Sequence, residues 1–435
     1  MSDIERAYRS KTRHSAHAMA RAKQVVPGGL TRYVGFHMPY PPVMDRADGA
    51  YLYDLDGNRY ADLMYNGLSL IHGHAYAPVV NALAAQTPKG WAWLGTSNAQ
   101  IAFAEAICGR LSAVERVVFT NSGTEAGMLA VKLARRFTRR PYILKARGGY
   151  HGTFTDLEAG LHGTGAIPGR ALLATFNDIA SFERELHNHP GQVAAIIVES
   201  VMYTGVVETP ENGFLQGLQE LARLHKVLFI LDDCLMLRLA SGGSAEKFGL
   251  HPDLTVLGKF VGGGIPVGVV GGRSEIVDLA DPGDPKGVYH GGSFNGNLLG
   301  AIAGLISLEH LTQEKIDAMD QRVERLRYAL RDKAALLGLP LRMQGAGSVL
   351  GLYFSTRPLV GGEDIPHPDV STLFHLACLN RGVQMGPGGL AAWATVATDT
   401  VVDEVVCAMG AALGDVVNDD SQCVEVLMKS LALST

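Results

Sequence analysis

Short apolar segments alternate with helical segments from about residue 95 onward, and this alternation limits the fold more than any other feature. Apolar side chains fill almost every position of the segments 116–120, 142–145, 194–198, 227–231, 255–257 and 267–270. Strands that are apolar on both faces belong to sheets that helices cover on both sides, and such sheets are mostly parallel. The chain is therefore predicted to be an α/β protein with a mostly parallel central sheet.

The pattern changes towards both ends of the chain. The first residues predict one exposed amphipathic helix that ends before Pro27, and residues 50–64 predict a β-hairpin around Asp56-Gly57. After about residue 338, short strands such as 348–354 alternate with loops rich in Gly and Pro, and two helices follow. We expect a large domain over residues 61–337. Residues 1–60 and 338–435 are expected to form a smaller α+β domain.

Charge and composition argue against several functional classes. A formal net charge of -5 gives no electrostatic footprint for nucleic acid. The first residues lack the apolar stretch of a signal peptide, and 291–308 fits a buried helix better than a membrane span. The cysteines form no C-x-x-C pair and are odd in number, which is typical of reduced thiols in a cytoplasmic protein. They are Cys108, Cys234, Cys378, Cys407 and Cys423.

Two of the predicted strands end at residues that could bind a charged ligand. Parallel sheets bind ligands beyond the carboxyl ends of their strands. After 116–120 come Ser122, Gly123 and Thr124, which predict either an anion site at a helix N-terminus or an ordinary N-cap. After 227–231 come Asp232 and Asp233, which could pair with a cationic ligand group, cap a helix or form an ion pair.

A third strand end carries Lys259 in an apolar, glycine-rich segment, 258–264. Burial there would lower the pKa of the amine and favour its neutral, nucleophilic form. The alternative is a lysine whose stem lies on the surface while its charge reaches water. An anion site, a carboxylate and an isolated lysine at three strand ends together match what pyridoxal phosphate needs: a phosphate site, a partner for the pyridine nitrogen and a Schiff-base amine.

With these motifs the sequence resembles the class III aminotransferases, which are fold-type I pyridoxal-phosphate-dependent enzymes. The resemblance runs from about residue 27 to about residue 410. It rests on N-S-G-T-E-A at 121–126, G-Y-H-G at 149–152, V-E at 198–199, L-D-D at 231–233, L-G-K at 257–259 and G-S-F-N-G-N at 292–297. It implies the fold-type I architecture, pyridoxal phosphate as cofactor, an amino donor and an oxo acceptor as substrates, and a homodimer with shared active sites.

The resemblance also implies roles for the residues at matching positions. Lys259 would form the Schiff base, and Asp232 would pair with the pyridinium nitrogen. The other cofactor-binding positions are Ser122, Gly123, Thr124, Tyr150, His151, Glu199, Cys234 and Ser293. In the family the first three hold the phosphate, the tyrosine stacks on the ring with the histidine beside it, and the glutamate lies near the phenolic edge. Cys234 would lie under the ring where valine is usual, and Ser293 would reach the phosphate of the neighbouring subunit.

The substrate is predicted from the segment around Arg32. This segment resembles β-amino-acid transaminases, in which an arginine binds the substrate carboxylate; the alternative is a surface arginine after a turn. A second arginine that some of these enzymes carry is missing from the turn Pro387-Gly388-Gly389, so we expect a modified acceptor pocket.

The sequence therefore predicts an aminotransferase that acts between a β-amino acid, or a related 3-amino carboxylate, and a 2-oxo acid. An aminomutase of the glutamate-1-semialdehyde type is the main alternative, and a racemase or a decarboxylase of the same class stays open. Asp233 and Cys234, which stand where the family has Glu and Val, also leave open a non-catalytic homologue that binds the cofactor.

Two further motifs are not expected to bind ligands. The pair His72 and His74 has no third ligand nearby in the sequence, so no metal site is predicted. The segment 345–351 resembles a dinucleotide-binding fingerprint, but its third glycine comes one position late and 342–344 makes a poor preceding strand.

Overall fold

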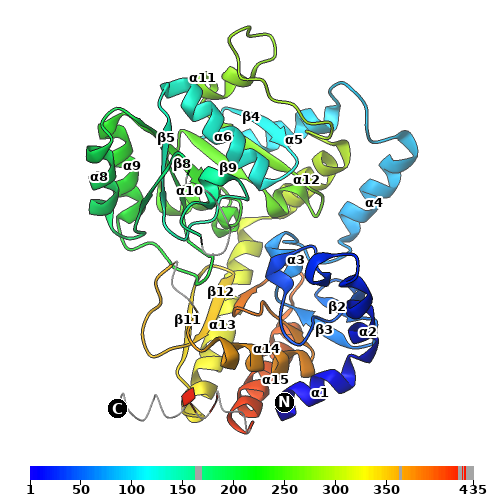
Figure 1. The fold of residues 1–435 in the computed structure, drawn as a ribbon. Coiled ribbons are helices and arrows are strands. Elements are labelled where there is room, and N and C mark those ends of the chain that lie inside the picture. Colours follow the sequence, from blue (N-terminus) through cyan, green and yellow to red (C-terminus); the bar gives the residue numbers. More distant parts are fainter. Residues whose placement is uncertain (162–168, 362–364, 420–423, 425, 428–435) are drawn as a thin grey trace.

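A seven-stranded sheet forms the centre of the upper half of the molecule (Figure 1). The computed structural model describes residues 1–161, 169–361, 365–419, 424 and 426–427. The strands are β4 (Arg116–Thr120), β5 (Tyr142–Ala146), β6 (Ala171–Ala174), β7 (Val193–Glu199), β8 (Leu228–Asp232), β9 (Leu254–Leu257) and β10 (Gly268–Gly272). Their order is β4-β10-β9-β8-β7-β5-β6, and only β10 runs antiparallel to its neighbours. The mostly parallel sheet is confirmed, although β6 was not predicted.

Helices cover both faces of this sheet, because successive residues of each strand point to opposite sides. Ala195 and Ile197 of β7 pack in one cluster with α6 (Gly123–Thr138), whereas Ile196 and Val198 pack in another with α8 (Ile179–Asn188) and α9 (Phe214–His225). The remaining helices of residues 65–310 are α3 (Tyr65–Leu68), α4 (Ala77–Gln86), α5 (Asn98–Arg110), α7 (Thr155–Glu158), α10 (Gly243–Phe248), α11 (Ser274–Val277) and α12 (Leu298–His310). The prediction that helices cover both faces of the sheet is therefore confirmed.

Two smaller sheets lie in the lower half of Figure 1. One contains β1 (Met44–Asp48), β2 (Tyr51–Asp54), β3 (Arg59–Asp62) and β13 (Val383–Gln384). The other contains β11 (Leu341–Ala346), β12 (Val349–Phe354) and β14 (Leu390–Ala392). Helices α13 (Gln313–Leu336), α14 (Pro368–Asn380) and α15 (Asp399–Val417) accompany them. The predicted hairpin is β2–β3, and β13 pairs parallel with β3, which joins the two ends of the chain. The domain borders at 60/61 and 337/338 stay predictions.

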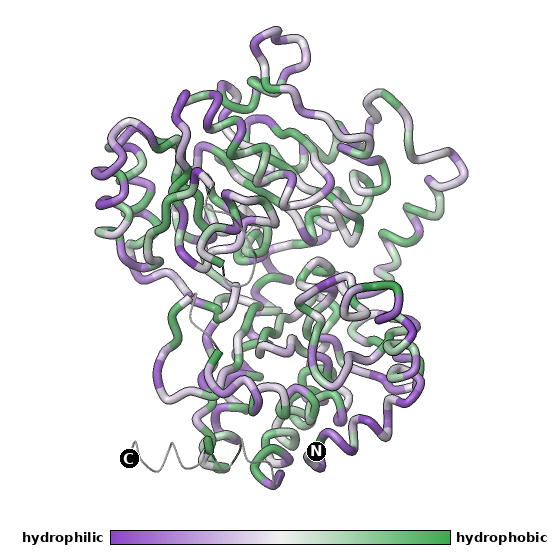
Figure 2. Tube along the Cα trace, in the orientation of Figure 1, coloured by the Kyte–Doolittle hydropathy of each residue, from purple (hydrophilic) through white to green (hydrophobic). Residues whose placement is uncertain are grey.

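The N-terminal segment differs from the single exposed helix that was predicted. It forms α1 (Asp3–Lys11) and α2 (Arg13–Ala22), which are separated by Thr12 in a non-helical conformation. The Thr12 hydroxyl donates to the carbonyl of Tyr8 (2.8 Å). Figure 2 shows these helices largely in the hydrophilic colour, yet Ile4, Tyr8 and Met19 are buried in the main core. The few apolar residues of the segment therefore anchor it to the protein.

Two other expectations are decided by the fold. Residues 342–344 do form a strand, contrary to the prediction. However, β11 turns directly back into β12, so the glycines at 345 and 347 lie in a hairpin and precede no helix, as a dinucleotide-binding motif would require.

Residues 298–310 form the partly buried helix α12. Across the described ranges, no helix combines the length and the apolar character needed to cross a bilayer. Cys108, Cys234, Cys378 and Cys407 are free thiols, and Cys423 lies outside the described residues.

Candidate active site

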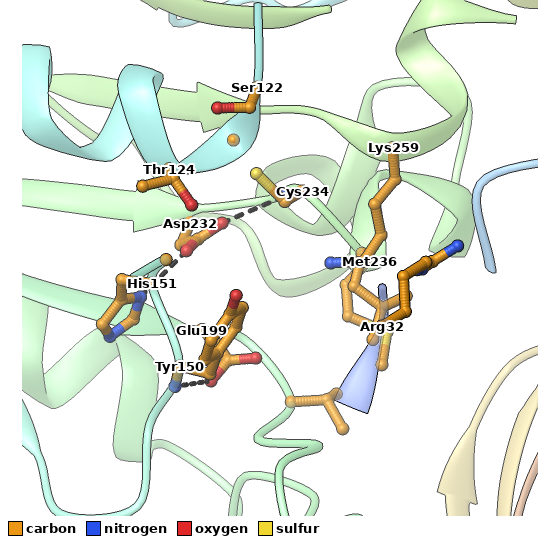
Figure 3. Close-up of a pocket in the computed structure, with 14 residues that line it drawn as sticks. Arg32, Ser122, Thr124, Tyr150, His151, Glu199, Asp232, Cys234, Met236 and Lys259 are labelled. Atoms are coloured by element: carbon orange, nitrogen blue, oxygen red, sulfur yellow. Dashed lines mark hydrogen bonds and ion pairs between the residues drawn. The ribbon is translucent and has the colours of Figure 1, made fainter. Parts of the chain in front are cut away.

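The ends of β4, β8 and β9 meet at one cavity of about 310 Å³ (Figure 3). Ser122, Asp232 and Lys259 follow or end these strands and all line the cavity. Its wall consists of Arg32, Ser122, Gly123, Thr124, Tyr150, His151, Gly152, Glu199, Val201, Asp232, Cys234, Leu235, Met236 and Lys259. The structure therefore brings together every predicted site residue except Ser293. The lining residues that were not assigned a role are Gly152, which belongs to the G-Y-H-G motif, and Val201, Leu235 and Met236, which lie two or three residues after a motif. Their position beside the motifs was the only signal.

The N-terminus of α6 forms the anionic end of the cavity. Ser122 is the N-cap residue, and its hydroxyl accepts from the backbone N–H of Glu125 (3.1 Å). Thr124 Oγ1 accepts from the N–H of Thr153 (3.2 Å), which ties the helix start to the G-Y-H-G loop. The first N–H groups of a helix lack helical partners, and the helix dipole places positive charge there. The N-cap and the anion site are thus two properties of the same helix end.

Asp232 and His151 form a buried pair beside this helix end (Figure 3). His151 Nδ1 lies 2.9 Å from Asp232 Oδ2, and the N–H of Cys234 donates to Asp232 Oδ1 (3.1 Å). Burial lowers the pKa of His151, so the neutral ring donates to the carboxylate. Burial raises the pKa of Asp232, but the hydrogen bond from His151 and the charge of Lys259 outweigh it and the pKa falls. Asp232 is therefore an ionised carboxylate, ready to pair with a cationic ring nitrogen.

Lys259 begins a 3-10 turn with a strained backbone. Its φ of 54° is left-handed, which is rare for a residue with a side chain and is typical of functional sites. Its Nζ lies 5.3 Å from the centroid of the Tyr203 ring. Burial lowers the pKa of Lys259, but Tyr203, Cys234 and Asp232 raise it more, so the pKa is raised overall. In the protein without a cofactor the amine is therefore protonated, and the prediction of a neutral amine is wrong. The side chains that raise its pKa come from other parts of the sequence.

Glu199 holds the loop that carries Tyr150. Its Oε1 accepts from the backbone N–H of Tyr150 (2.8 Å), as Figure 3 shows. Burial and the neighbouring Asp232 carboxylate raise the pKa of Glu199 to about 8. Near neutral pH this side chain is therefore mostly protonated and can donate a hydrogen bond into the cavity.

Lys145 is a positioning residue that the sequence prediction missed. It is buried in β5, and its Nζ donates to the carbonyls of Gly149 (2.7 Å), Leu157 (2.8 Å) and Ala159 (2.8 Å). Burial lowers its pKa to about 8, so the amine is protonated at pH 7 and its three N–H groups match the three carbonyls. The signal was a single charged residue inside an otherwise apolar strand. Lys145 thus fixes both ends of the loop that carries Tyr150 and His151.

Arg32 enters the cavity wall from the N-terminal segment. Its Nη1 donates to the carbonyl (3.2 Å) and to Oδ1 of Asn66. Asn66 belongs to α3, where Tyr65, Asn66, Gly67 and Leu68 have φ values of 41°, 57°, 68° and 66°. This is a left-handed turn, which is unfavourable for residues with a Cβ. A Cβ on Gly67 would lie 2.5 Å from Arg32 Nη2, so a larger residue at this position would displace the guanidinium.

The two unusual residues after Asp232 leave the cavity chemistry intact. Asp233 does not line the cavity; its Oδ2 accepts from the N–H of Ser244 (2.9 Å) at the start of α10, and burial raises its pKa to about 7. Cys234 packs between the helix end and the lysine loop, because its Sγ lies within 3.0 Å and 3.2 Å of a Cβ built on Gly123 and on Gly258. Burial raises the pKa of Cys234, so the thiol stays protonated.

Three other candidates lie elsewhere. Ser293 lines a different cavity, together with Trp91 and Phe294. His72 contacts Thr395 Oγ1 (2.8 Å) and the carbonyl of Ser307 (2.9 Å). His74 Nε2 lies 2.7 Å from Asp62 Oδ2. Within the described ranges no group of three or more His, Cys, Asp or Glu side chains is arranged to hold a metal ion.

Comparison with known proteins agrees with this geometry. The family model described as aminotransferase class-III matches residues 35–389. A glutamate-1-semialdehyde 2,1-aminomutase of Roseiflexus castenholzii is 34% identical over 431 residues, which cover 94% of this chain and 99% of the relative.

Solved structures show the same architecture. An omega-transaminase from Sphaerobacter thermophilus is 33% identical with a TM-score of 0.87, over 92% of this chain and 97% of the other. A β-phenylalanine aminotransferase from Variovorax paradoxus is 30% identical with a TM-score of 0.89, over 94% and 96%. These likenesses confirm the fold-type I architecture. Pyridoxal phosphate is the cofactor of this fold and is bound in another solved transaminase of the group.

Replacing Lys145 tests its positioning role. In Lys145→Met three buried carbonyls lose their donor, and each unsatisfied group costs about 1–3 kcal/mol. We expect the free energy of unfolding to fall by about 3 kcal/mol or more and pyridoxal phosphate to bind more weakly, measured by denaturant unfolding and by titration of the apo-protein. Lys333→Met, an exposed change on α13, is the control and should alter neither. Unchanged stability and cofactor affinity in Lys145→Met would contradict the role.

Proposed function

Because the chain belongs to the class III aminotransferases, we propose that it transfers an amino group between a 3-amino carboxylate, such as a β-amino acid, and a 2-oxo acid. The observation that carries this proposal is the cavity that combines the N-terminus of α6, the ionised Asp232 and the strained Lys259. A fold alone hosts many chemistries, so the proposal rests on this site.

The residues of the cavity fit pyridoxal phosphate. The α6 N-terminus with Ser122 and Thr124 offers hydrogen-bond donors and positive dipole charge to the phosphate. Asp232 is a buried anion, which would be unfavourable without a cationic partner, and the pyridinium nitrogen supplies one. When bound, the cofactor supplies an electron sink for carbanion chemistry at the amino-bearing carbon.

The chain's own residues would then divide the work. Lys259 Nζ would attach the cofactor. After its release, Nζ would take the proton from the amino-bearing carbon of the substrate and return it to the C4′ carbon of the cofactor. Asp232, held by His151, would keep the ring nitrogen protonated. Tyr150 would cover the ring, and Glu199, protonated near pH 7, would donate a hydrogen bond to its phenolic edge.

Arg32 supports a carboxylate substrate. A guanidinium can bind a carboxylate with two parallel, charge-assisted hydrogen bonds. Arg32 lines the same cavity as Lys259 but comes from a different part of the chain, so it could hold the carboxylate while the amine reacts at the lysine. The β-phenylalanine aminotransferase among the structural neighbours supports the 3-amino carboxylate class.

An aminomutase reaction is the second candidate. Its support is that three relatives, which are 34–36% identical to this chain, are named glutamate-1-semialdehyde 2,1-aminomutase. An aminomutase moves the amino group within one molecule and releases no oxo product, whereas a transaminase does.

A homodimer is the proposed assembly. The segment between α4 and α5 runs out from the body of the molecule in Figure 1 and exposes Trp91, Trp93 and Leu94. Tyr289 and Phe294, close to Ser293 in the sequence, are also exposed. Apolar surface of this kind favours association. Ser293, which lies outside its own chain's cavity, could then serve the partner's phosphate site. A cytoplasmic location stays a prediction from the unpaired cysteines.

Half-reactions test the proposed activity directly. Wild-type enzyme loaded with pyridoxal phosphate and mixed with a 3-amino acid should release the oxo acid in equal amount to the aminated cofactor, followed by absorbance and product analysis. Lys259→Ala should lose both the visible band and turnover. Isomerised amino acid without any oxo product would support the aminomutase, and no reaction with any amine would contradict both.

Mixing two inactive variants tests the shared site. Ser293→Asp would place a carboxylate against the phosphate, and Lys259→Ala removes the reacting amine. If Ser293 serves the partner, co-refolding the two variants restores about a quarter of wild-type activity, since half of the dimers are mixed and each has one intact site. A mixture that stays inactive, or a protein that sediments as a monomer, would overturn the proposed assembly.

A further inference from the structure

A second cavity of about 470 Å³ begins at Arg32. It lies between the N-terminal loop, the left-handed turn of α3, the strands β1 and β2, and residues 384–387. Arg32 lines both this cavity and the one that holds Lys259, so the two spaces meet at its side chain. The volume is in the range of small-molecule pockets.

The wall of the second cavity is mainly apolar. Its apolar side chains include Leu30, Val34, Met44, Leu52, Met64 and Leu70. Gly67 lies at the junction and has no side chain to separate the two spaces. A ligand that reaches past Arg32 therefore gains contact with hydrophobic surface, and each buried methylene strengthens binding.

The charges at this cavity disfavour a substrate that carries a second carboxylate besides the one at Arg32. Among the described residues that line it, Arg32 is the one with a permanent positive charge. The other ionisable groups are Asp62 and His74, which are bonded to each other at 2.7 Å. The turn that follows, 387–389, is Pro-Gly-Gly and carries no charge. A dicarboxylate would thus place its second anion near Asp62 and against apolar side chains, which is unfavourable.

We propose that the second cavity is the site for the substrate's side chain, and that the enzyme acts on 3-amino monocarboxylates with a large apolar substituent. The carboxylate binds Arg32 at the junction, the amine faces Lys259, and the substituent fills the apolar cavity. This inference rests on the proposed aminotransfer and names its substrate class. It also assigns the oxo acceptor: a monocarboxylic 2-oxo acid fits, and a dicarboxylic one such as 2-oxoglutarate does not.

A chain-length series tests the inference on the cofactor-loaded enzyme. Straight-chain 3-amino acids from 3-aminobutanoate to 3-aminodecanoate are assayed with pyruvate as acceptor. We expect kcat/KM to rise about fourfold for each of the first added methylenes, as for burial of about 0.8 kcal/mol per group. With one amino donor, 2-oxohexanoate should exceed 2-oxoglutarate as acceptor at least tenfold.

Val34→Trp probes the cavity without touching the cofactor site, since Val34 lines only the second cavity and is partly exposed. The variant fills this cavity and should abolish the gain in kcat/KM with chain length, so that short and long 3-amino acids react about equally fast. Val25→Trp, a change at a more exposed valine of the N-terminal segment that lines neither cavity, is the control and should keep the wild-type profile.

A measurement on the wild type keeps the test decisive if Val34→Trp does not fold. Straight-chain carboxylates from butanoate to decanoate should inhibit competitively, with an inhibition constant that falls as the chain lengthens. A flat chain-length profile in turnover and inhibition, or a preference for 2-oxoglutarate, would overturn the side-chain site. Absence of aminotransfer with every amine would contradict the proposed function instead, so the two failures are distinguishable.

Discussion

Asp232 keeps a negative charge in a buried position because His151 donates a hydrogen bond to it and the charge of Lys259 acts on it. A buried carboxylate is costly without such partners. His151 is in turn held by its loop, and that loop is fixed by the buried Lys145 and by Glu199. The Lys145 ammonium in β5 thus holds the backbone of the loop, the loop positions His151, and His151 positions the Asp232 carboxylate. The geometry of the site therefore depends on one connected network of buried charges and hydrogen bonds.

Strained backbone occurs at two places on the walls of the cavities. Lys259 and the turn from Tyr65 to Leu68 have left-handed φ values, which cost about 1–3 kcal/mol for each residue with a side chain. Both are held by packing: Phe260 and Leu68 are buried, and Gly263 lies against α12 so closely that no Cβ would fit. The strain places Nζ of Lys259 in the cavity and turns Asn66 towards Arg32. The large hydrophobic core of the protein supports both conformations.

Much of the site could be predicted because its residues follow strands. Apolar runs identify β4, β8 and β9, and parallel strands end at one edge, so Ser122, Asp232 and Lys259 had to meet. The pKa of Lys259 was predicted wrongly, because its neighbours Tyr203, Cys234 and Asp232 come from the ends of β7 and β8 and the loops that follow, which are distant from Lys259 in the sequence.

Other features needed the folded chain. The second cavity, which Arg32 lines, brings residues 30–74 next to residues 384–387, and no local sequence pattern predicts that contact.

The central claim, that Asp232 as an anion drives the chemistry, is tested by the single-turnover rate of the cofactor-loaded enzyme in wild type and Asp232→Asn. We predict that the variant still binds the cofactor but reacts with the amine about a thousandfold or more slowly. A rate within about tenfold of wild type would contradict the account.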